Sequence, residues 1–393
     1  MKVALVSPDD LSSALFCKEV VSLLKNRYKF DVFVLGDIYD KTGCYSDIIR
    51  AWGVHYVPIK VERYIEPFAD LQFFYSMCRF FRTQGIAAVI TNCTKPNVYG
   101  PLAARWAGIR NILCSFWGRG SVFVDTDHLS SKAIRGILLG LYSLSFKASS
   151  KVWFTNFNDY QYLLRHGIVQ KEKSILSKNY VNTDEYNTKP LPTERLQALR
   201  QELALRDTDK VVIMVGRLVW AKGVREFVEA ARLLKDRLPF VKFIFVGPKE
   251  EGLRDVVPES YLRENAKLGN FLWTGFRKDV KDLYALADLA VLPSYYKEGG
   301  FPRGLTEPMS MGKPIIAADT VDCRGPVEDG KNGYLVPIKD PKSLADSIET
   351  IMRDNKKKKE FGLYSRLKAV KELDEKVIVA KVLEEFVAGF RMI

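Results

Sequence analysis

Short apolar runs without regular alternation recur along the chain, and segments with helical spacing of apolar residues separate them. The first run, Lys2–Val6, is followed by a pattern that places Phe16, Val20 and Leu24 on one side of a helix. Unalternating runs are typical of parallel strands that are covered on both faces. In the first half, strands are expected at Lys2–Val6, Phe30–Leu35, Val54–Ile59, Ala87–Thr91, Asn111–Phe116 and Lys151–Thr155. The alternation predicts an α/β fold of parallel βαβ units.

The pattern stops in a polar stretch from Asn179 to Asp209, which contains two prolines and indicates a linker followed by a short helix. It then restarts, with strands expected at Lys210–Val215, Val241–Val246, Asn270–Thr274, Leu289–Leu292 and Pro314–Ala318. A chain of 393 residues is longer than one average domain. We therefore expect two α/β domains, residues 1–186 and 187–375, followed by a mostly helical end.

The net charge of +13 favours an anionic partner. Basic residues outnumber acidic ones in both halves, so the excess is not a tail. On charge alone, nucleic acid, anionic lipid and a sugar nucleotide all remain possible. A lysine run at Lys356–Lys359 indicates a solvated helix end, with a role in binding a membrane or an acidic partner as the alternative.

Six cysteines are present without a CxxC spacing, which is typical of reduced thiols in a cytoplasmic protein. The three histidines have no metal-ligand spacing, and no aspartate pair resembles a metal motif. The N-terminal segment begins with a strand rather than a signal peptide. No apolar run approaches the ~20 residues of a membrane span. We expect a cytoplasmic protein without a metal centre.

The stretch from Val291 to Pro314 combines a strand, a glycine-rich turn and a helix. Gly299, Gly300 and Gly304 form the turn, and the helical segment is expected at Glu307–Met311. A turn of this kind before a helix N-terminus presents backbone N–H groups and the positive helix end to an anion. The stretch therefore predicts a phosphate site, although an ordinary connection between strand and helix is the alternative.

Two carboxylates flank this turn, Glu298 before it and Glu307 after it. A carboxylate repels phosphate, but it accepts hydrogen bonds from sugar hydroxyls. Phosphate and sugar in one pocket indicate a nucleotide sugar. Ordinary surface acids are the alternative interpretation.

A basic pair follows the first strand of the second domain. The strand ends at Val215, Gly216 makes a turn, Arg217 and Lys222 follow, and Gly223 opens a helix. Ligands of open parallel sheets bind at the carboxyl ends of the strands, so the pair is expected to share the cleft of the glycine-rich turn. A planar guanidinium and a mobile ammonium suit a diphosphate. The spacing differs from the phosphate loop of nucleoside triphosphatases, and two surface cations are the alternative.

In the first domain, the loops Thr91–Gly100 and Phe116–Ser121 also follow expected strands. Gly118 permits close backbone approach, Arg119 could meet a phosphate, and Trp117 could stack on a sugar. A tight turn and a core tryptophan are the alternatives.

Together, these motifs resemble the retaining GT-B glycosyltransferases over nearly the whole chain. The most specific are G-R-L-x-x-x-K-G at Gly216–Gly223, P-S-Y-x-K-E-G-x-F-P at Pro293–Pro302 and V-E-D-G-x-N-G at Val327–Gly333. The resemblance implies two facing Rossmann-like domains, with the acceptor on the first and the nucleotide sugar on the second. It also implies that a C-terminal helix, residues 376–393, packs back on the first domain.

The resemblance further implies residue roles. Arg217 and Lys222 would bind the diphosphate and stabilise the leaving group, and Glu298 would contact the donor sugar. The implied donor-binding residues are Gly216, Phe276, Arg277, Gly300, Phe301, Pro302, Arg303, Gly304, Leu305, Thr306 and Glu307, the last through the ribose hydroxyls. The acceptor-binding residues expected in the first domain are Asn92, Lys95, Trp117, Gly118 and Arg119. The activity implied is metal-independent, uses no cofactor, and takes a nucleoside-diphosphate sugar, with UDP expected, as co-substrate.

The chain departs from the family pattern in three places. Eight residues instead of seven separate Glu298 from Glu307, Leu11 to Ser13 replace a double-glycine loop, and Trp117 replaces a histidine before Gly118. The extra glycine either bulges out or displaces Glu298.

Within the family, the stretches GRGSVFVD, LYSLSFK and SYYKEGGFP are similar to enzymes that extend polyprenyl-diphosphate-linked sugars with N-acetylhexosamine in bacterial glycan assembly. Aromatic and aliphatic residues edged by cations in Phe68–Arg82 and Lys132–Lys147 predict peripheral attachment to the inner face of the plasma membrane. Domain core is the alternative for each stripe.

Three other functions are alternatives. A sugar-nucleotide epimerase can share the architecture but needs acid–base residues. A non-catalytic nucleotide-sugar-binding subunit would tolerate the altered glutamate spacing. A nucleic-acid-binding protein would fit the charge, but no module for it is recognisable, and no nucleic acid is expected as a partner.

Overall fold

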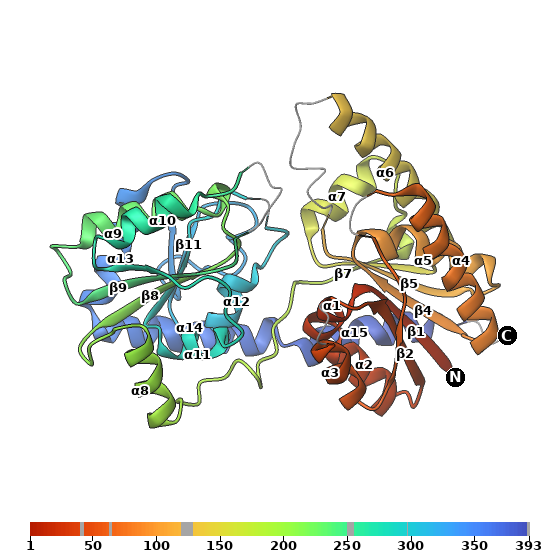
Figure 1. Cartoon of the computed structure of the whole chain (residues 1–393), viewed down its shortest axis with the longest axis horizontal. Coiled ribbons are helices and arrows are strands. Elements are labelled where there is room, and N and C mark those ends of the chain that lie inside the picture. The colour runs from red at the N-terminus through yellow and green to blue at the C-terminus, as the bar shows by residue number, and fades with distance from the viewer. Residues whose placement is uncertain (40–42, 63–64, 119–128, 250–254, 297, 391–393) are drawn as a thin grey trace. The chain divides into compact units, whose positions relative to one another are not determined.

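The computed structural model describes residues 1–39, 43–62, 65–118, 129–249, 255–296 and 298–390 (Figure 1). The chain divides into two compact units, unit 1 with residues 1–178 and 376–393, and unit 2 with residues 179–375. Helices cover both faces of the sheet in each unit. The expected α/β fold with two Rossmann-like domains is confirmed.

Unit 1 contains a parallel sheet with the strand order β3-β2-β1-β4-β5-β6-β7. Its strands are β1 (Lys2–Asp9), β2 (Asp31–Asp37), β3 (His55–Pro58), β4 (Ala88–Asn92), β5 (Asn111–Phe116), β6 (Lys151–Phe154) and β7 (Ser174–Leu176). Its helices are α1 (Asp10–Phe16), α2 (Lys18–Asn26), α3 (Cys44–Ala51), α4 (Pro67–Gln84), α5 (Thr94–Trp106), α6 (Leu129–Ala148), α7 (Phe157–Arg165) and, from Lys376 onward, α15 (Glu375–Ala388).

The strands of unit 1 are buried on both faces, which explains why their sequences do not alternate. Ala4 and Val6 of β1 pack in one core cluster with α4 and α5, whose contacts include Phe73 and Ala103. The residues between them, such as Leu5, point to the opposite face and are buried too.

Unit 2 contains a second parallel sheet with the order β10-β9-β8-β11-β12-β13. Its strands are β8 (Lys210–Val215), β9 (Val241–Val246), β10 (Phe271–Trp273), β11 (Leu289–Leu292), β12 (Ile315–Ala318) and β13 (Gly333–Val336). Its helices are α8 (Thr193–Glu202), α9 (Val224–Leu234), α10 (Glu259–Ala266), α11 (Val280–Leu286), α12 (Arg303–Ser310), α13 (Pro341–Arg353) and α14 (Asn355–Glu372), with a 3-10 turn η3 (Trp220–Lys222).

Alternate residues of β8 enter two separate cores. Val212 and Met214 pack with residues of α9 and α13, whereas Val211 and Ile213 pack with residues of α11 and α12. Because the sheet is held between two helical layers, its strand ends stay fixed, and the loops after them can carry a site.

Two boundaries in the structure differ from those expected. The chain passes from unit 1 to unit 2 between residues 178 and 179 rather than between 186 and 187. The reason is that residues 179–186 pack against the rest of unit 2. The Val181 N–H donates to the Leu373 carbonyl at 2.9 Å, and the Ser310 hydroxyl donates to the Tyr186 carbonyl at 2.5 Å. Helix α12 begins at Arg303, four residues before the expected start, with Pro302 as its N-cap.

In unit 1, helix α15 is tied down by ion pairs at two points. Arg27 pairs with Glu384 at 2.5 Å, and Lys151 pairs with Glu385 at 2.6 Å. Leu383 and Phe386 of the same helix are buried. Among the described residues, no helix is long and apolar enough to cross a membrane.

Candidate functional site

The strand order of unit 2 reverses at the neighbouring strands β8 and β11. From β8 the chain proceeds to β9 and β10 on one side, and from β11 it proceeds to β12 and β13 on the other. Open α/β sheets bind ligands outside the carboxyl ends of the strands at such a reversal, and this place in unit 2 is here termed the crevice. The basic pair follows β8, and the glycine-rich turn follows β11, so the crevice brings the two predicted motifs together.

Backbone contacts lock these two loops together. Gly223 has a φ of +85°, and a Cβ there would lie 2.2 Å from the Pro293 carbonyl oxygen. The Ala221 carbonyl accepts hydrogen bonds from the N–H groups of Tyr295 and Tyr296, each at 2.9 Å. Gly223 thus serves a close approach that any side chain would prevent.

Lys222 and Glu298 form an ion pair across the crevice. Their side chains are only 12% and 5% exposed, so both charges are largely removed from water. The Ser294 hydroxyl, itself buried, donates to the other carboxylate oxygen of Glu298 at 2.5 Å. The eight-residue spacing has not moved Glu298 away from the basic pair.

Arg217 and Lys222 share a neighbour, the ring of Tyr296. The guanidinium carbon lies 4.9 Å from the ring centroid and the ammonium nitrogen 5.2 Å from it. Both distances are within the range of cation–π attraction. The predicted cations therefore converge on one spot beside Glu298.

The extra residue after Glu298 is accommodated by a left-handed run. Gly299, Gly300 and Phe301 have φ values of +80°, +74° and +47°. Phe301, a non-glycine residue in this strained region, is anchored because its N–H donates to the Asp322 carbonyl at 3.3 Å. Its ring also packs so closely on Gly325 that a Cβ there would lie 2.6 Å from it.

Helix α12 starts against the end of β8, since a Cβ at Gly304 would lie 2.9 Å from the Val215 carbonyl oxygen. Its N-terminal end thus lies in the crevice, as the anion site requires. Leu305 and Thr306 are buried, and Pro302 caps the helix. Gly216, at the end of β8, donates its N–H to the Val246 carbonyl at 3.0 Å.

Glu307 lies in the interior of α12 rather than at its start. Arg303, one turn earlier, places its Nε 2.9 Å from the Glu307 carboxylate. Burial raises the pKa of Glu307 above its ordinary value, against the opposing effects of Arg303 and of a hydrogen bond with Tyr186.

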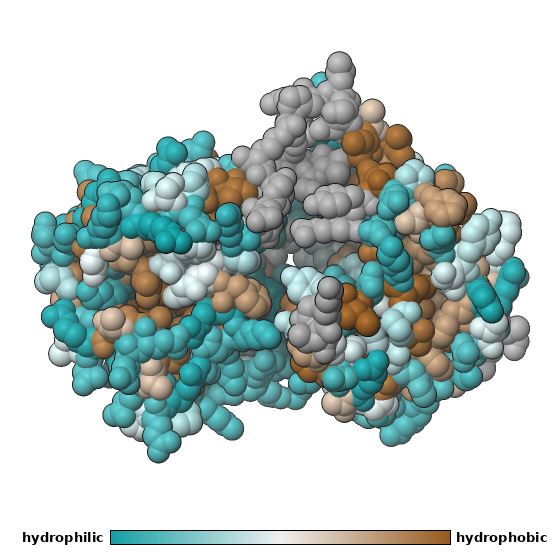
Figure 2. Space-filling view, in the orientation of Figure 1, coloured by the Kyte–Doolittle hydropathy of each residue, from teal (hydrophilic) through white to brown (hydrophobic). Residues whose placement is uncertain are grey.

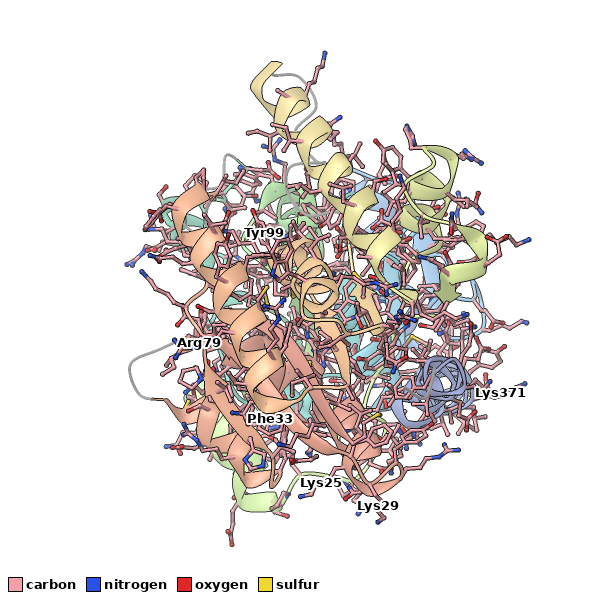
Figure 3. All side chains as sticks on the ribbon, turned by 90° about the vertical axis from the view of Figure 1, so that its right-hand side faces the viewer. Lys25, Lys29, Phe33, Arg79, Tyr99 and Lys371 are labelled. Atoms are coloured by element: carbon pink, nitrogen blue, oxygen red, sulfur yellow. The ribbon has the colours of Figure 1, made fainter. Side chains whose placement is uncertain are left out.

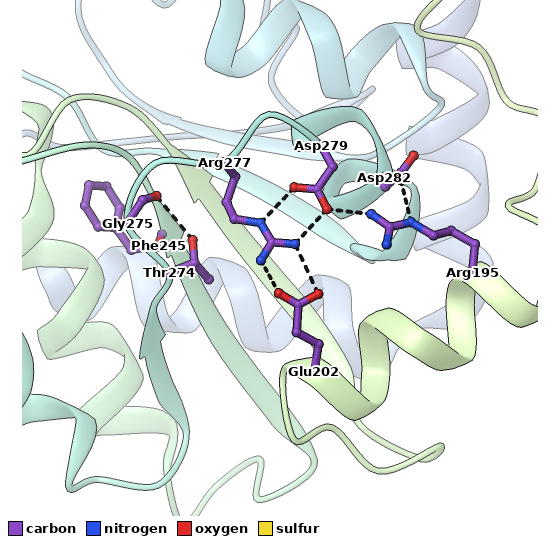
Figure 4. Close-up of polar contacts among 8 residues, drawn as sticks. All are labelled: Arg195, Glu202, Phe245, Thr274, Gly275, Arg277, Asp279 and Asp282. Atoms are coloured by element: carbon purple, nitrogen blue, oxygen red, sulfur yellow. Dashed lines mark hydrogen bonds and ion pairs between the residues drawn. The ribbon is translucent and has the colours of Figure 1, made fainter. Parts of the chain in front are cut away.

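Phe276 and Arg277 follow β10, the strand at one edge of the sheet of unit 2. Arg277 is held by Asp279 and Glu202, and Asp279 also pairs with Arg195 at 2.6 Å (Figure 4). The hydrogen bonds to Asp279 and Glu202 raise the pKa of Arg277. Phe276 is 61% exposed, so its ring is accessible, whereas Arg277 has its donors directed at carboxylates.

The residues predicted for acceptor binding do not converge in the same way. In unit 1, Asn92 is buried and donates to the Ser7 hydroxyl at 2.8 Å. Lys95 pairs with Asp70 of α4 at 2.5 Å in a largely buried contact. The amide nitrogen of Asn92 and the ammonium of Lys95 are thus engaged within the unit.

Trp117 and Gly118 follow directly after β5. The indole of Trp117 packs at a tilted angle on Phe16, with the ring centroids 5.0 Å apart. Arg119 lies outside the described residues. The acceptor assignments stay predictions.

Sequence reasoning assigned no role to Ser294, Tyr296 or Tyr186. Ser294 and Tyr296 lie inside the motif P-S-Y-x-K-E-G-x-F-P, close in sequence to Glu298, and this position could have identified them. Tyr186 had no local signal, because its partner Glu307 is far away in the chain. No group of three or more histidine, cysteine, aspartate or glutamate side chains suited to a metal occurs in the part of the chain that the structure describes.

Glycosyltransferases are among the known proteins that this chain resembles. Residues 197–368 match the family model described as Glycosyl transferases group 1. Over 385 residues, 98% of each chain, the protein is 26% identical to the N,N'-diacetylbacillosaminyl-diphospho-undecaprenol alpha-1,3-N-acetylgalactosaminyltransferase of Campylobacter jejuni. It is also 23% identical, over 86% of each chain, to the UDP-Gal:alpha-D-GlcNAc-diphosphoundecaprenol alpha-1,3-galactosyltransferase of Escherichia coli.

Among solved structures, the Anabaena protein Alr3699/HepE in complex with UDP superposes with a TM-score of 0.76 at 21% identity. The match covers 99% of this chain and 100% of that one. At this identity, the likeness shows the fold.

Proposed function

From the match of residues 197–368 to the group 1 glycosyl transferase model and from the GT-B fold, we propose a specific reaction. The protein transfers a hexose or N-acetylhexosamine, with retention of the anomeric configuration, from a UDP-linked sugar to a polyprenyl-diphosphate-linked glycan. The observation that carries the proposal is the buried contact of Lys222 with Glu298 beside Arg217 and the N-terminal end of α12. The product belongs to bacterial surface-glycan or glycoprotein assembly.

The chemistry divides between the cations and the carboxylates. Arg217, Lys222 and the positive end of α12 stabilise the departing diphosphate, a charge that grows as the sugar bond breaks. Glu298 accepts hydrogen bonds from the donor sugar, and Glu307 from the ribose. Three fixed positive groups supply the charge stabilisation, so the reaction is proposed to run without a metal.

The choice of UDP and of a lipid-linked acceptor follows the relatives. The Escherichia coli relative is named for UDP-Gal, and the Anabaena structure contains UDP. Both enzyme relatives carry undecaprenyl diphosphate in their names. Phe276, exposed at the crevice edge, is proposed to border the base.

A lipid-linked acceptor requires access to a membrane, and the outer surface of unit 1 is suited to one. Phe68 and Tyr75 of α4 are 71% and 56% exposed, and Ile137 of α6 is 66% exposed. Figure 2 shows hydrophobic side chains gathered over α6. Phe73 and Phe81, counted among the surface aromatics from the sequence, are instead buried in the core.

Cations edge this apolar surface. Arg79 lies on the exposed side of α4 (Figure 3), and Lys132 and Lys147 are exposed on α6. Apolar groups edged by cations suit the interface of an anionic membrane. We therefore propose peripheral attachment to the cytoplasmic face of the membrane through this surface.

The test is a panel of nucleoside-diphosphate sugars incubated with a polyprenyl-diphosphate-linked acceptor. We expect acceptor-dependent release of nucleoside diphosphate with one UDP-sugar and a product with the donor's anomeric configuration. Binding of UDP without turnover of any donor would support a non-catalytic subunit instead. Interconversion of donor sugars without transfer would support an epimerase.

A further inference from the structure

Tyr296 lies in the loop after β11, at the point where this loop contacts the loop after β8. The proposed function gives this residue no role. Its ring is 4.9 Å from the guanidinium of Arg217 and 5.2 Å from the ammonium of Lys222. It is the adjacent residue, Tyr295, whose ring contacts a different cation, Lys339, at 4.9 Å. The two neighbouring tyrosines therefore serve different cations.

The position of Tyr296 is fixed by its backbone. Its N–H lies 2.9 Å from the Ala221 carbonyl and 3.2 Å from the Ser294 hydroxyl. Ala221 directly precedes Lys222, and Ser294 contacts Glu298. These backbone contacts therefore fix the ring beside both Lys222 and Glu298.

Two cations side by side repel each other, and a group that attracts both of them opposes this repulsion. The face of an aromatic ring carries the negative part of its quadrupole, which attracts both cations without forming a bond that a ligand must break. When a diphosphate takes the place of Glu298 at Lys222, the ring contact can persist. A carboxylate in the position of Tyr296 would instead compete with the phosphates.

We propose that Tyr296 is a positioning residue, whose ring holds Arg217 and Lys222 side by side so that both meet the diphosphate of the donor. The inference rests on the proposed function and adds to it the group that sets the geometry of the basic pair. It acts through the two cations and makes no contact with the reacting atoms.

The test compares Tyr296→Leu, which removes the ring, with Tyr296→Phe, which keeps it, and with Tyr295→Leu as the matched control. Calorimetry measures the binding of UDP, ligand-observed NMR measures the binding of uridine, which lacks phosphates, and kinetics measure turnover of the donor found in the panel. Tyr296→Leu should weaken UDP binding and lower kcat/KM by about tenfold, with uridine binding unchanged. Tyr296→Phe and Tyr295→Leu should stay close to the wild type.

Several results would overturn this role. One is that Tyr296→Leu binds UDP as tightly as the wild type, and another is that it loses uridine binding in the same proportion as UDP binding. A Tyr296→Phe variant as impaired as Tyr296→Leu would assign the effect to the hydroxyl instead of the ring. A wild-type protein that turns over no donor contradicts the proposed function itself, whereas an active protein insensitive to Tyr296→Leu contradicts this inference alone.

Discussion

At the scale of single residues, the ion pair of Lys222 and Glu298 is the contact that the proposed donor would have to replace. Both side chains have already lost most of their water. A diphosphate that replaces Glu298 at Lys222 therefore meets a cation with little hydration left to remove, in surroundings where charges interact strongly. In the proposed reaction, Glu298 is released at the same moment and accepts hydrogen bonds from the hydroxyls of the sugar.

Lys222→Ala tests the cation. The turnover rate should fall by at least about tenfold, because a hydrogen bond to a charged group contributes about 1.5–3 kcal/mol and each 1.4 kcal/mol is about tenfold in rate. The measurement is steady-state release of nucleoside diphosphate, with Lys267→Ala, an exposed lysine after α10, as the control. Near-normal turnover by folded Lys222→Ala would remove the basic pair from the site.

The same substitution leaves the Glu298 carboxylate buried without its cation, which destabilises a protein by about 3–5 kcal/mol in comparable cases. Lys222→Ala/Glu298→Ala removes both charges, so its unfolding free energy should recover part of that loss while its activity stays low. This double variant separates a loss of stability from a loss of catalysis.

At the scale of elements, the loop between β11 and α12 is fixed at both ends. Glu298 is held by Lys222 and Ser294, and Phe301 is held by the Asp322 carbonyl and by Asn179, whose amide donates to the Phe301 carbonyl at 3.3 Å. The two glycines must span the gap between these anchors with left-handed backbone, which glycine adopts without strain.

Deletion of Gly300 restores the seven-residue spacing but shortens this span. With one residue fewer, the loop cannot keep both Glu298 and Phe301 in their present positions. The deletion should therefore lower turnover as much as Glu298→Ala does. Both variants are measured side by side in the same donor assay. A deletion variant with appreciable activity would mean that the extra glycine only bulges out, and full activity in Glu298→Ala would refute both versions.

The loop before β13 is joined to α14 by a group of charges. Glu328 accepts from Lys368 at 2.7 Å and from the Tyr364 hydroxyl at 2.6 Å. These hydrogen bonds, that of Lys368 first, lower the pKa of Glu328 from 4.5 to about 2. A carboxyl with a lowered pKa in the folded state stabilises the fold above its unfolded pKa and loses that contribution as the pH falls.

Glu328→Gln should therefore lower the unfolding free energy at neutral pH. The difference from the wild type should shrink as the pH falls from 4.5 towards about 2, because Glu328 becomes protonated in both states. Denaturant unfolding over this pH range measures it, with Glu360→Gln on the exposed side of α14 as the control. A difference independent of pH would show that the contact contributes through packing instead of charge.

The parallel sheets could be predicted from the sequence, and so could the shared location of Arg217, Lys222 and Glu298. Both predictions depend on local patterns, namely buried strands and the loops at their ends. It was insufficient where contacts join distant parts of the chain. The start of α12 depends on Pro302 and on the packing of Gly304 against β8, and the engagement of Lys95 depends on Asp70. Apolar spacing along α4 likewise could not distinguish the buried Phe73 from the exposed Phe68.

At the scale of the whole molecule, peripheral attachment predicts co-sedimentation with vesicles that contain phosphatidylglycerol. Binding should fall as salt rises, because mobile ions screen the attraction between the cations and anionic lipid. Phe68→Ser/Tyr75→Ser should weaken it at every salt concentration, since apolar burial is lost.

Leu233→Ser, at an exposed leucine on α9 of unit 2, is the matched control and should bind like the wild type. The idea fails if vesicles are not bound even at low salt and a water-soluble acceptor without lipid is used equally well.

The division of the chain into units also has a consequence for its synthesis. Unit 1 is discontinuous, since the chain leaves it at Lys178 and returns at Lys376. A ribosome therefore completes all of unit 2, with the basic pair and the glycine-rich turn, before it makes the part of α15 that carries Leu383 and Phe386 into unit 1. Since domains fold as units during synthesis, unit 2 can fold while the first unit still waits for its last helix. The half of the protein that begins first is thus the half that finishes last.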